Sequence, residues 1–140
     1  MKVKVKKLKP EAVIPDYSHP GDAGLNLYCL EDKVLGPGQR HLFDTGIALE
    51  VPGGHVCLIW GRSGLAIKGG LHHLGGVVDA GYRGEVRVNL VNLGTEAYAF
   101  KKGDKIAQLL IQPIASVEIE EAEELSDSAR AEGSFGSTGR

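Results

Sequence analysis

The sequence predicts an all-β fold of the sandwich or barrel type, built as one domain with a single short helix. Apolar side chains recur mostly with a period of two, which is typical of strands with one buried face. Glycine supplies 20 of the 140 residues, roughly twice the usual fraction. Turn signals such as 36–38 (Gly-Pro-Gly) and 52–54 (Pro-Gly-Gly) separate the apolar patterns at short intervals.

The expected strands follow from these patterns in chain order. Apolar and polar residues alternate in segments 3–5, 25–29 and 85–90, which predicts strands with one buried face. Continuous apolar runs at 56–60 and 106–111, the second interrupted by a glutamine, predict strands buried on both faces.

One short helix is expected over residues 63–68, because Ser63 can cap its start and Gly69-Gly70 can end it. Residues 118–131 are acidic and have no apolar stripe, which favours an exposed connection over a surface helix. The composition of the glycine- and serine-rich end, 133–140, is typical of a flexible tail.

Composition excludes several classes of function. Sixteen basic and eighteen acidic residues give a formal charge of −2, with no strong overall attraction to nucleic acid or to anionic membranes. No apolar run approaches the ~20 residues that a membrane helix needs. Cys29 and Cys57 are too few for a disulfide framework or a zinc cluster, so a reduced, cytoplasmic compartment is expected. The adjacent His72 and His73 should point to opposite faces of a strand, and no metal site is assigned to histidine.

Two segments could bind an anion. Arg62-Ser63-Gly64 opens the expected helix, whose unpaired N–H groups suit a phosphate, although Ser63 is equally suited to an ordinary cap. The tail could offer backbone N–H groups and hydroxyls to phosphate oxygens, the alternative being a disordered terminus. Phe135 favours a role in binding, since an aromatic ring can stack on a base.

Asp79 is the candidate carboxylate of a third segment, 75–85. An aspartate at the head of a turn is common for structural reasons alone. The same position would suit a carboxylate that orients a water molecule at the mouth of a pocket. The glycine-rich loops with the strongest nucleotide signatures, the P-loop and Gly-x-Gly-x-x-Gly, are absent from the sequence.

Taken together, these segments resemble the homotrimeric deoxyuridine triphosphatases (dUTPases), from about Ile14 to Arg140. All five motifs of that family appear in order, at 23–27 (AGLNL), 61–66 (GRSGLA), 76–85 (GVVDAGYRGE), 102–109 (KGDKIAQL) and 130–139 (RAEGSFGSTG).

The resemblance implies a jelly-roll, or distorted β-barrel, over residues 1–126 and a flexible, glycine-rich lid over 127–140. It implies a homotrimer with shared active sites that hydrolyses dUTP to dUMP and pyrophosphate with Mg²⁺ held by the triphosphate. That reaction limits uracil in DNA and supplies dUMP for thymidylate synthesis.

The resemblance also implies roles for individual residues. Asp79 would activate the water that attacks the α-phosphorus, and Tyr82 would pack under the deoxyribose. The hairpin over residues 73–78, with His73, Gly76, Val77 and Val78, would read uracil through backbone groups. Contacts to the triphosphate would come from Arg62, Ser63, Gly64 and Gln108 of a neighbouring subunit. The tail would close over the nucleotide through Arg130, Phe135, Gly136, Ser137 and Thr138.

The sequence departs from the family pattern at a few positions. Asn26 stands where the first motif normally has Asp, so the polar shell near the metal-bound waters loses one negative charge, although Asn still accepts hydrogen bonds. Gly61 replaces a usual Pro, and Ala131 and Ser134 replace two tail glycines. His73 lies near a position that in some relatives is an Asn touching uracil.

Two other functions compete with this interpretation. A dCTP deaminase shares the fold and the Val-Asp-x-Gly-aromatic segment, but its catalytic Glu would fall at Asn89. A non-catalytic nucleotide sensor is compatible with Asn26, whereas the presence of Asp79, Tyr82 and Phe135 together argues against it. Pyrophosphate release, ammonia release or neither would separate the three functions.

Overall fold

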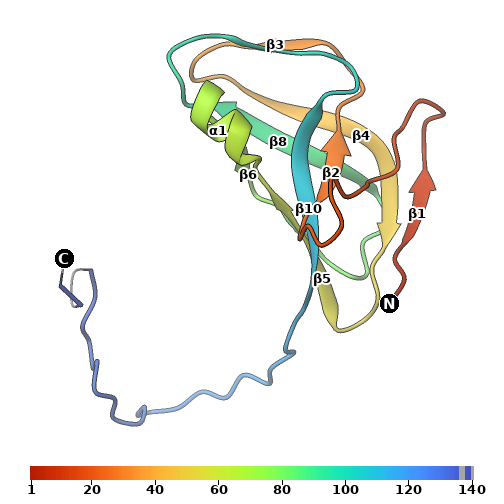
Figure 1. Cartoon of the computed structure of the whole chain (residues 1–140). Helices are drawn as coiled ribbons and strands as arrows, with labels where there is room; N and C mark the ends of the chain where they lie inside the picture. The colour runs from red at the N-terminus through yellow and green to blue at the C-terminus, as the bar shows by residue number, and fades with distance from the viewer. Residues whose placement is uncertain (136–137, 140) are drawn as a thin grey trace.

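The computed structural model describes residues 1–135 and 138–139, and it is built almost entirely from short β-strands. Figure 1 shows the strands wrapped into one body, with a single helix lying against one end of it. The elements in chain order are β1 Lys4–Lys7, β2 Leu25–Tyr28, β3 Lys33–Leu35, β4 Arg40–Glu50, β5 His55–Trp60, α1 Ser63–Gly69, β6 Leu71–Leu74, β7 Val77–Val78, β8 Glu85–Asn92, β9 Tyr98–Phe100 and β10 Lys105–Pro113.

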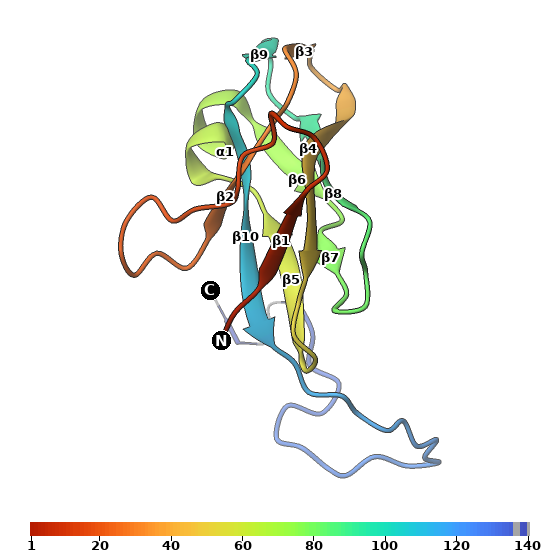
Figure 2. The ribbon, with the colours of Figure 1, turned by 90° about the vertical axis from the view of Figure 1, so that its right-hand side faces the viewer.

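The strands form two four-stranded sheets and a two-stranded ribbon. One sheet has the order β1-β4-β8-β6, the other β2-β10-β5-β7, and β3 pairs with β9 at one end of the barrel. Every pairing is antiparallel. Figure 2 shows the two sheets facing one another, so the expected all-β jelly-roll is confirmed.

The core fills the space between the sheets. Its largest fully buried side chains are Phe43 and Phe100, whose rings meet edge to face at 4.9 Å. Alternation along β8 buries Val86, Val88 and Leu90 on one face, as the period of two predicts. The free thiols of Cys29 and Cys57 are both buried in this core.

The N-cap residue of helix α1 lies one residue earlier in the chain than the sequence predicts. Arg62 occupies the N-cap position with extended backbone, no side chain caps the helix, and Ser63 is already helical. The expected cap by Ser63 is therefore wrong, because Ser63 lies one position inside the helix. The expected end is confirmed: Gly70 adopts a left-handed conformation and its N–H bonds to the Ala66 carbonyl.

The segment 73–78 is not a hairpin. Strand β6 pairs with β8 in one sheet, whereas β7 pairs with β5 in the other. The chain crosses between the sheets at Gly75-Gly76, both with positive φ. A side chain on Gly76 would meet the Ile59 carbonyl oxygen at 2.6 Å, so this crossing needs glycine.

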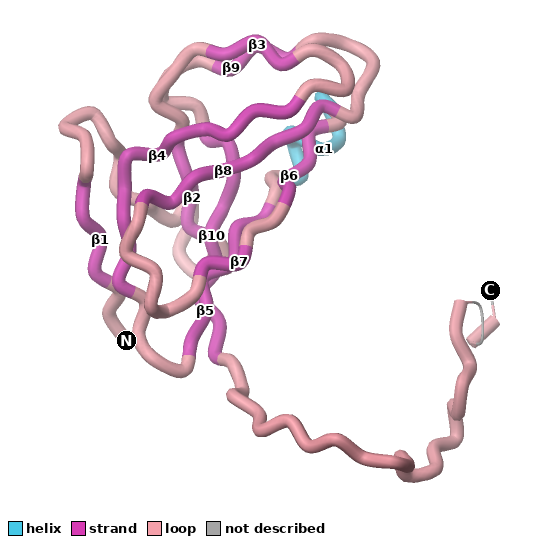
Figure 3. Tube along the Cα trace, turned by 180° about the vertical axis from the view of Figure 1, so that it is seen from behind, coloured by secondary structure: helices cyan, strands magenta, loops and turns pink. Residues whose placement is uncertain are grey.

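Beyond β10 the chain forms neither helix nor strand over residues 114–135. These residues are exposed, and Figures 1 and 3 show the segment leaving the barrel at the end of β10 and running away from it. The acidic stretch 118–131 is therefore the exposed connection that its composition favours. Among the described residues, no helix has the length and apolar character needed to cross a membrane.

Candidate functional site

The candidate site residues gather at two clefts. The first, which we call the α1 cleft, has a volume of about 420 Å³ and lies between the start of α1 and the loop before β2. Its lining residues are Ser18, His19, Asp22, Ala23, Gly24, Asn26, Arg62, Ser63, Gly64 and Gln108. The second, the β7 cleft, has a volume of about 400 Å³ and is lined by Leu42, Val77, Val78, Asp79, Tyr82, Glu85, Val86 and Arg87.

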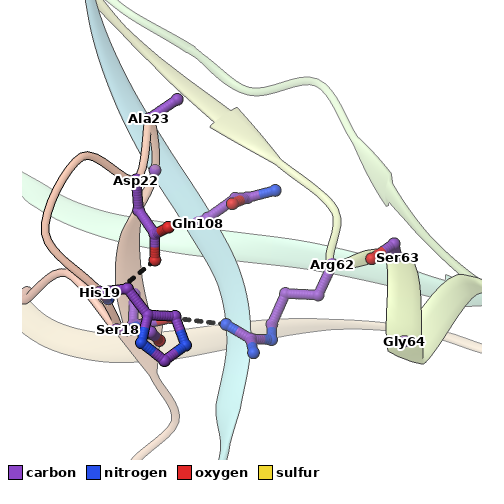
Figure 4. Close-up of a pocket in the computed structure, with 10 residues that line it drawn as sticks. Ser18, His19, Asp22, Ala23, Arg62, Ser63, Gly64 and Gln108 are labelled. Carbon is purple, nitrogen blue, oxygen red and sulfur yellow. Dashed lines mark hydrogen bonds between the residues drawn. The ribbon is translucent and has the colours of Figure 1, made fainter.

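The α1 cleft is built to present a cation and free N–H groups. In Figure 4 the Arg62 side chain extends from the start of α1 toward the loop that carries Ser18 and His19. The first turn of α1 contains no acidic residue, so the positive end of the helix dipole and Arg62 act in the same direction. Such an arrangement suits a phosphate chain.

Asn26 holds Arg62 in place from the floor of the α1 cleft. Its Oδ1 accepts a hydrogen bond from Arg62 Nη1 at 2.5 Å, and only 3% of the residue is exposed. Gln108, on β10, donates from Nε2 to the Gly61 carbonyl at 3.0 Å, which fixes the turn before Arg62. The four residues expected to contact phosphates, Arg62, Ser63, Gly64 and Gln108, therefore lie at one cleft.

The β7 cleft brings together Asp79, Tyr82 and the two valines of β7. Asp79 is exposed just after the strand, and its carbonyl accepts the N–H of Tyr82 to close a turn. The Tyr82 hydroxyl donates to the Glu85 carbonyl at 3.1 Å, which fixes the ring at the cleft wall. A carboxylate thus stands beside an aromatic ring and two valines, a setting suited to a sugar and an attacking water.

His73 lies outside both linings and instead supports the α1 cleft. Its Nδ1 accepts a hydrogen bond from the Gly61 N–H at 3.0 Å, so Nδ1 carries no proton there. Its ring lies 5.6 Å from that of Trp60 and 4.7 Å from that of His72. Rings this close do not point straight to opposite faces as expected, although both residues lie within β6 and pair with Val91 and Leu90 of β8.

Replacing His73 with Asn is expected to flatten the pH dependence of stability. Burial lowers the pKa of His73 below its usual value near 6.5, and His72 lowers it further. The unfolded chain therefore takes up a proton first, so the contribution of neutral His73 is complete above pH 6.5 and is lost as the pH falls through the lower folded value.

Thermal unfolding of both proteins between about pH 5 and about pH 7.5 checks this expectation. The Asn carbonyl can still accept the Gly61 N–H but does not titrate, so the wild type should lose more stability on acidification. Equal losses in the two proteins would contradict the assignment.

The two clefts open at opposite ends of β5. Val78 pairs with Cys57, so Asp79 continues toward the His55 end of the strand, whereas Arg62 follows Trp60 at the other end. Extended chain from His55 to Arg62 spans roughly 20 Å. No residue lines both clefts. Within the part of the chain that the structure describes, Asp79 and Arg62 therefore line different clefts.

The segment after β10, which we call the arm, lines neither cleft with its described residues, 114–135 and 138–139. Arg130 donates from Nε to the Gly133 carbonyl at 2.8 Å within this segment itself, Phe135 is fully exposed to solvent, and Thr138 is exposed. Gly136 and Ser137 lie outside the described residues.

Sequence reasoning missed part of the α1 cleft. Ser18, His19 and Asp22 line it from the loop before β2, and Asp16 lies behind it. The one signal that could have led to them is Asn26, since a buried amide needs partners for both its N–H₂ and its carbonyl.

Comparison with known proteins gives a consistent result along the whole chain. A family model described as dUTPase matches residues 10–139. The chain is 47% identical over 140 residues to the deoxyuridine 5'-triphosphate nucleotidohydrolase of Clostridium tetani, covering 99% of this chain and 97% of the relative. It is 47% identical over 142 residues to the protein of the same name from Nautilia profundicola, with 100% of both chains covered.

Solved structures show the same fold. The dUTPase of Staphylococcus bacteriophage 80alpha with dUpNHpp is similar with a TM-score of 0.94 and 32% identity, covering 99% of both chains. A mutant dUTPase from phage phi11 of S. aureus, described with a coordinated structural Mg(II) ion, has a TM-score of 0.83 and 29% identity. That match covers 89% of this chain and 98% of the other.

Proposed function

Because this chain belongs to the dUTPase family, we propose that it is a dUTP nucleotidohydrolase that converts dUTP to dUMP and pyrophosphate. The observation that carries the proposal is the β7 cleft, where Asp79 and Tyr82 stand together beside the backbone of β7. The reaction needs an aligned water and neutralised charge rather than a covalent intermediate.

Asp79 is the proposed catalytic residue. Its exposed carboxylate accepts a proton from a water molecule and aims that water at the α-phosphorus. Tyr82, fixed by its hydrogen bond to the Glu85 carbonyl, lies under the deoxyribose and leaves no room for a 2′-hydroxyl.

The segment 73–78 is proposed to hold the base. Val77 and Val78 line the β7 cleft, and Gly75-Gly76, which carry no side chains, come directly before them in the chain. Backbone N–H and C=O groups can read the edge of uracil, and the close walls exclude the thymine methyl group. His73 acts at the start of this segment through its bond to Gly61.

The geometry of β5 favours a homotrimer with shared sites. A nucleotide with its base at Gly76 and its α-phosphorus at Asp79 runs along β7 away from Arg62 of the same chain. The contacts of Arg62, Ser63, Gly64 and Gln108 to the phosphates would then come from the α1 cleft of a neighbouring subunit.

The donor set suits Mg²⁺ held chiefly by the substrate. Among residues 1–135 and 138–139, no group of three His, Cys, Asp or Glu side chains is arranged to hold a metal ion. Phosphate oxygens are hard ligands that Mg²⁺ prefers, and the ion keeps several waters. The second lone pair of Asn26 Oδ1 could accept from one of those waters. When bound, Mg²⁺ neutralises phosphate charge as pyrophosphate leaves.

The division into a barrel, residues 1–126, and a lid, residues 127–140, is likewise a proposal. The last strand ends at Pro113, and beyond the bond from the Ile114 N–H to the Gly54 carbonyl the described residues 115–135 and 138–139 are exposed, a placement that would let them reach another site. Arg130 would approach the γ-phosphate, Phe135 the uracil ring, and Gly136, Ser137 and Thr138 the phosphate oxygens.

We place the enzyme in the cytoplasm, where dUTP removal limits uracil in DNA and dUMP feeds thymidylate synthesis. The two buried free thiols suit a reducing compartment. The formal charge of −2 gives no strong overall attraction to nucleic acid or to anionic membranes.

A single assay tests this function. Pyrophosphate release should be rapid with dUTP and Mg²⁺, and far slower with dTTP, dCTP or UTP or after chelation of the metal. Release of ammonia from dCTP would indicate a deaminase instead, and failure to release pyrophosphate from dUTP would overturn the proposal.

A further inference from the structure

A chain of hydrogen bonds runs behind the α1 cleft and ends on Arg62. The Tyr28 hydroxyl donates to Asp16 Oδ1 at 2.5 Å. The two protons of Asn26 Nδ2 are shared among three acceptors, the Asp16 carbonyl at 3.0 Å, Ser18 Oγ at 3.0 Å and the same Asp16 Oδ1 at 3.3 Å. Asn26 Oδ1 then accepts from Arg62 Nη1.

This arrangement requires an amide at position 26. The residue is 97% shielded from solvent, and its side chain must donate on one side and accept on the other. A carboxylate there would bring two negative groups to within hydrogen-bond distance of each other and would leave the Asp16 carbonyl with the backbone N–H of residue 26 as its donor, without the amide N–H₂.

The carboxylate of this network is instead at Asp16. Its hydrogen bond from Tyr28 lowers the pKa of Asp16, so it stays charged. Burial, and after it the bond to Asp16, raises the pKa of Tyr28 to about 12, so the hydroxyl remains a donor. Asp16 and Tyr28 are therefore held in the protonation states that their hydrogen bonds require.

We propose that Asp16 is a positioning residue for phosphate binding: through the Asn26 amide it fixes the direction of the Arg62 guanidinium. The proposal rests on the proposed function of the α1 cleft. Because the contact to Arg62 is made by a neutral amide, the guanidinium is oriented without being paired to a carboxylate, and its charge stays available for the triphosphate.

The test compares nucleotides that differ only in the groups Arg62 would touch. Binding of dUpNHpp with Mg²⁺ and of dUMP is measured by calorimetry for the wild type, Asp16→Ala and Asp16→Asn. Asp16→Ala should weaken dUpNHpp binding roughly 10-fold and leave dUMP binding unchanged. Asp16→Asn keeps an acceptor for Tyr28 and Asn26, so it should bind dUpNHpp close to the wild-type level.

A second pair of variants reverses the donor and the acceptor. Asn26→Asp alone should weaken dUpNHpp binding at least as much as Asp16→Ala. Combining it with Asp16→Asn should recover part of that loss, because the amide at 16 can then donate to the carboxylate at 26. Asp32→Asn, the same change at an exposed carboxylate beside Lys101, is the control and should bind as the wild type does.

The outcomes separate this inference from the proposed function. If the wild type does not bind dUpNHpp, the proposed function fails. If the wild type binds and Asp16→Ala loses dUMP and dUpNHpp equally, or neither, the positioning role is wrong. Should Asp16→Ala fold poorly, Tyr28→Phe removes one donor from a half-buried ring, and an unchanged ratio of the two affinities in that variant would also overturn the role.

Discussion

Replacing Asp79 with Asn is expected to lower kcat for dUTP by about 10²–10⁴-fold, the usual cost of losing a general base. Binding of dUpNHpp should stay within a few-fold of the wild type, because the carboxylate acts on the attacking water and barely on the bound nucleotide. Steady-state pyrophosphate release and calorimetric binding together measure the two effects.

Glu85→Gln is the matched control for Asp79→Asn. Glu85 lines the same cleft, but its Oε1 is occupied by the Gly46 N–H at 2.7 Å, and the Gln carbonyl can accept the same bond. We expect a much smaller loss of kcat in this control. A near-normal kcat in Asp79→Asn would show that Asp79 is not the base.

Removing all residues after Asp127 is expected to abolish most hydrolysis while leaving the barrel folded. In the described chain the arm contributes nothing to the buried core, so thermal stability without ligand should be unchanged. With nucleotide bound, a closed arm would add the stacking of Phe135, worth ~1–3 kcal/mol per base in single-strand recognition, and would exclude bulk water, other than the attacking molecule, from the reacting phosphate.

Phe135→Ala separates stacking from closure and should be milder than the truncation. Pyrophosphate release and thermal unfolding of both variants check the prediction. A truncated enzyme with close to full activity would remove the arm from the mechanism. A truncated protein that no longer folds would make the arm a structural element instead of a lid.

Strands with a clear alternation or a continuous apolar run could be located from the sequence. Segments 25–29, 56–60, 85–90 and 106–111 correspond to β2, β5, β8 and β10, which include three of the four central strands of the two sheets. In each of these strands, one face or both faces carry mostly apolar side chains, which is sufficient to predict a buried strand from the local sequence.

The longest strand, β4, was not predicted. Asp44, Thr45 and Gly46 interrupt its apolar pattern, and the pairing with β8 shifts register between Asp44 and Ala48. Thr45 is nonetheless buried because its hydroxyl donates to the Val86 carbonyl. Such a register shift depends on the partner strand, so it cannot be predicted from the periodicity of the strand's own sequence.

The candidate site likewise has a part that could be predicted from the sequence and a part that could not. Arg62 and Asp79 could be proposed from their local settings, and the resemblance gave each a role. The supporting contacts could not be predicted, since Asp16 reaches Asn26 only through the path of the loop before β2. The separation of the two clefts likewise follows from the register of β7 on β5, which joins segments distant in sequence.

The central claim, that each active site combines the β7 cleft of one subunit with the α1 cleft of another, is tested most directly by mixing two inactive variants. Asp79→Asn and Arg62→Ala proteins would be unfolded together in equal amounts, refolded and assayed for pyrophosphate release from dUTP. Random assembly into trimers should restore intact pairs at about a quarter of the sites, and hence about a quarter of wild-type activity. Activity no higher than that of the separate variants, with mixed trimers present, would contradict shared sites.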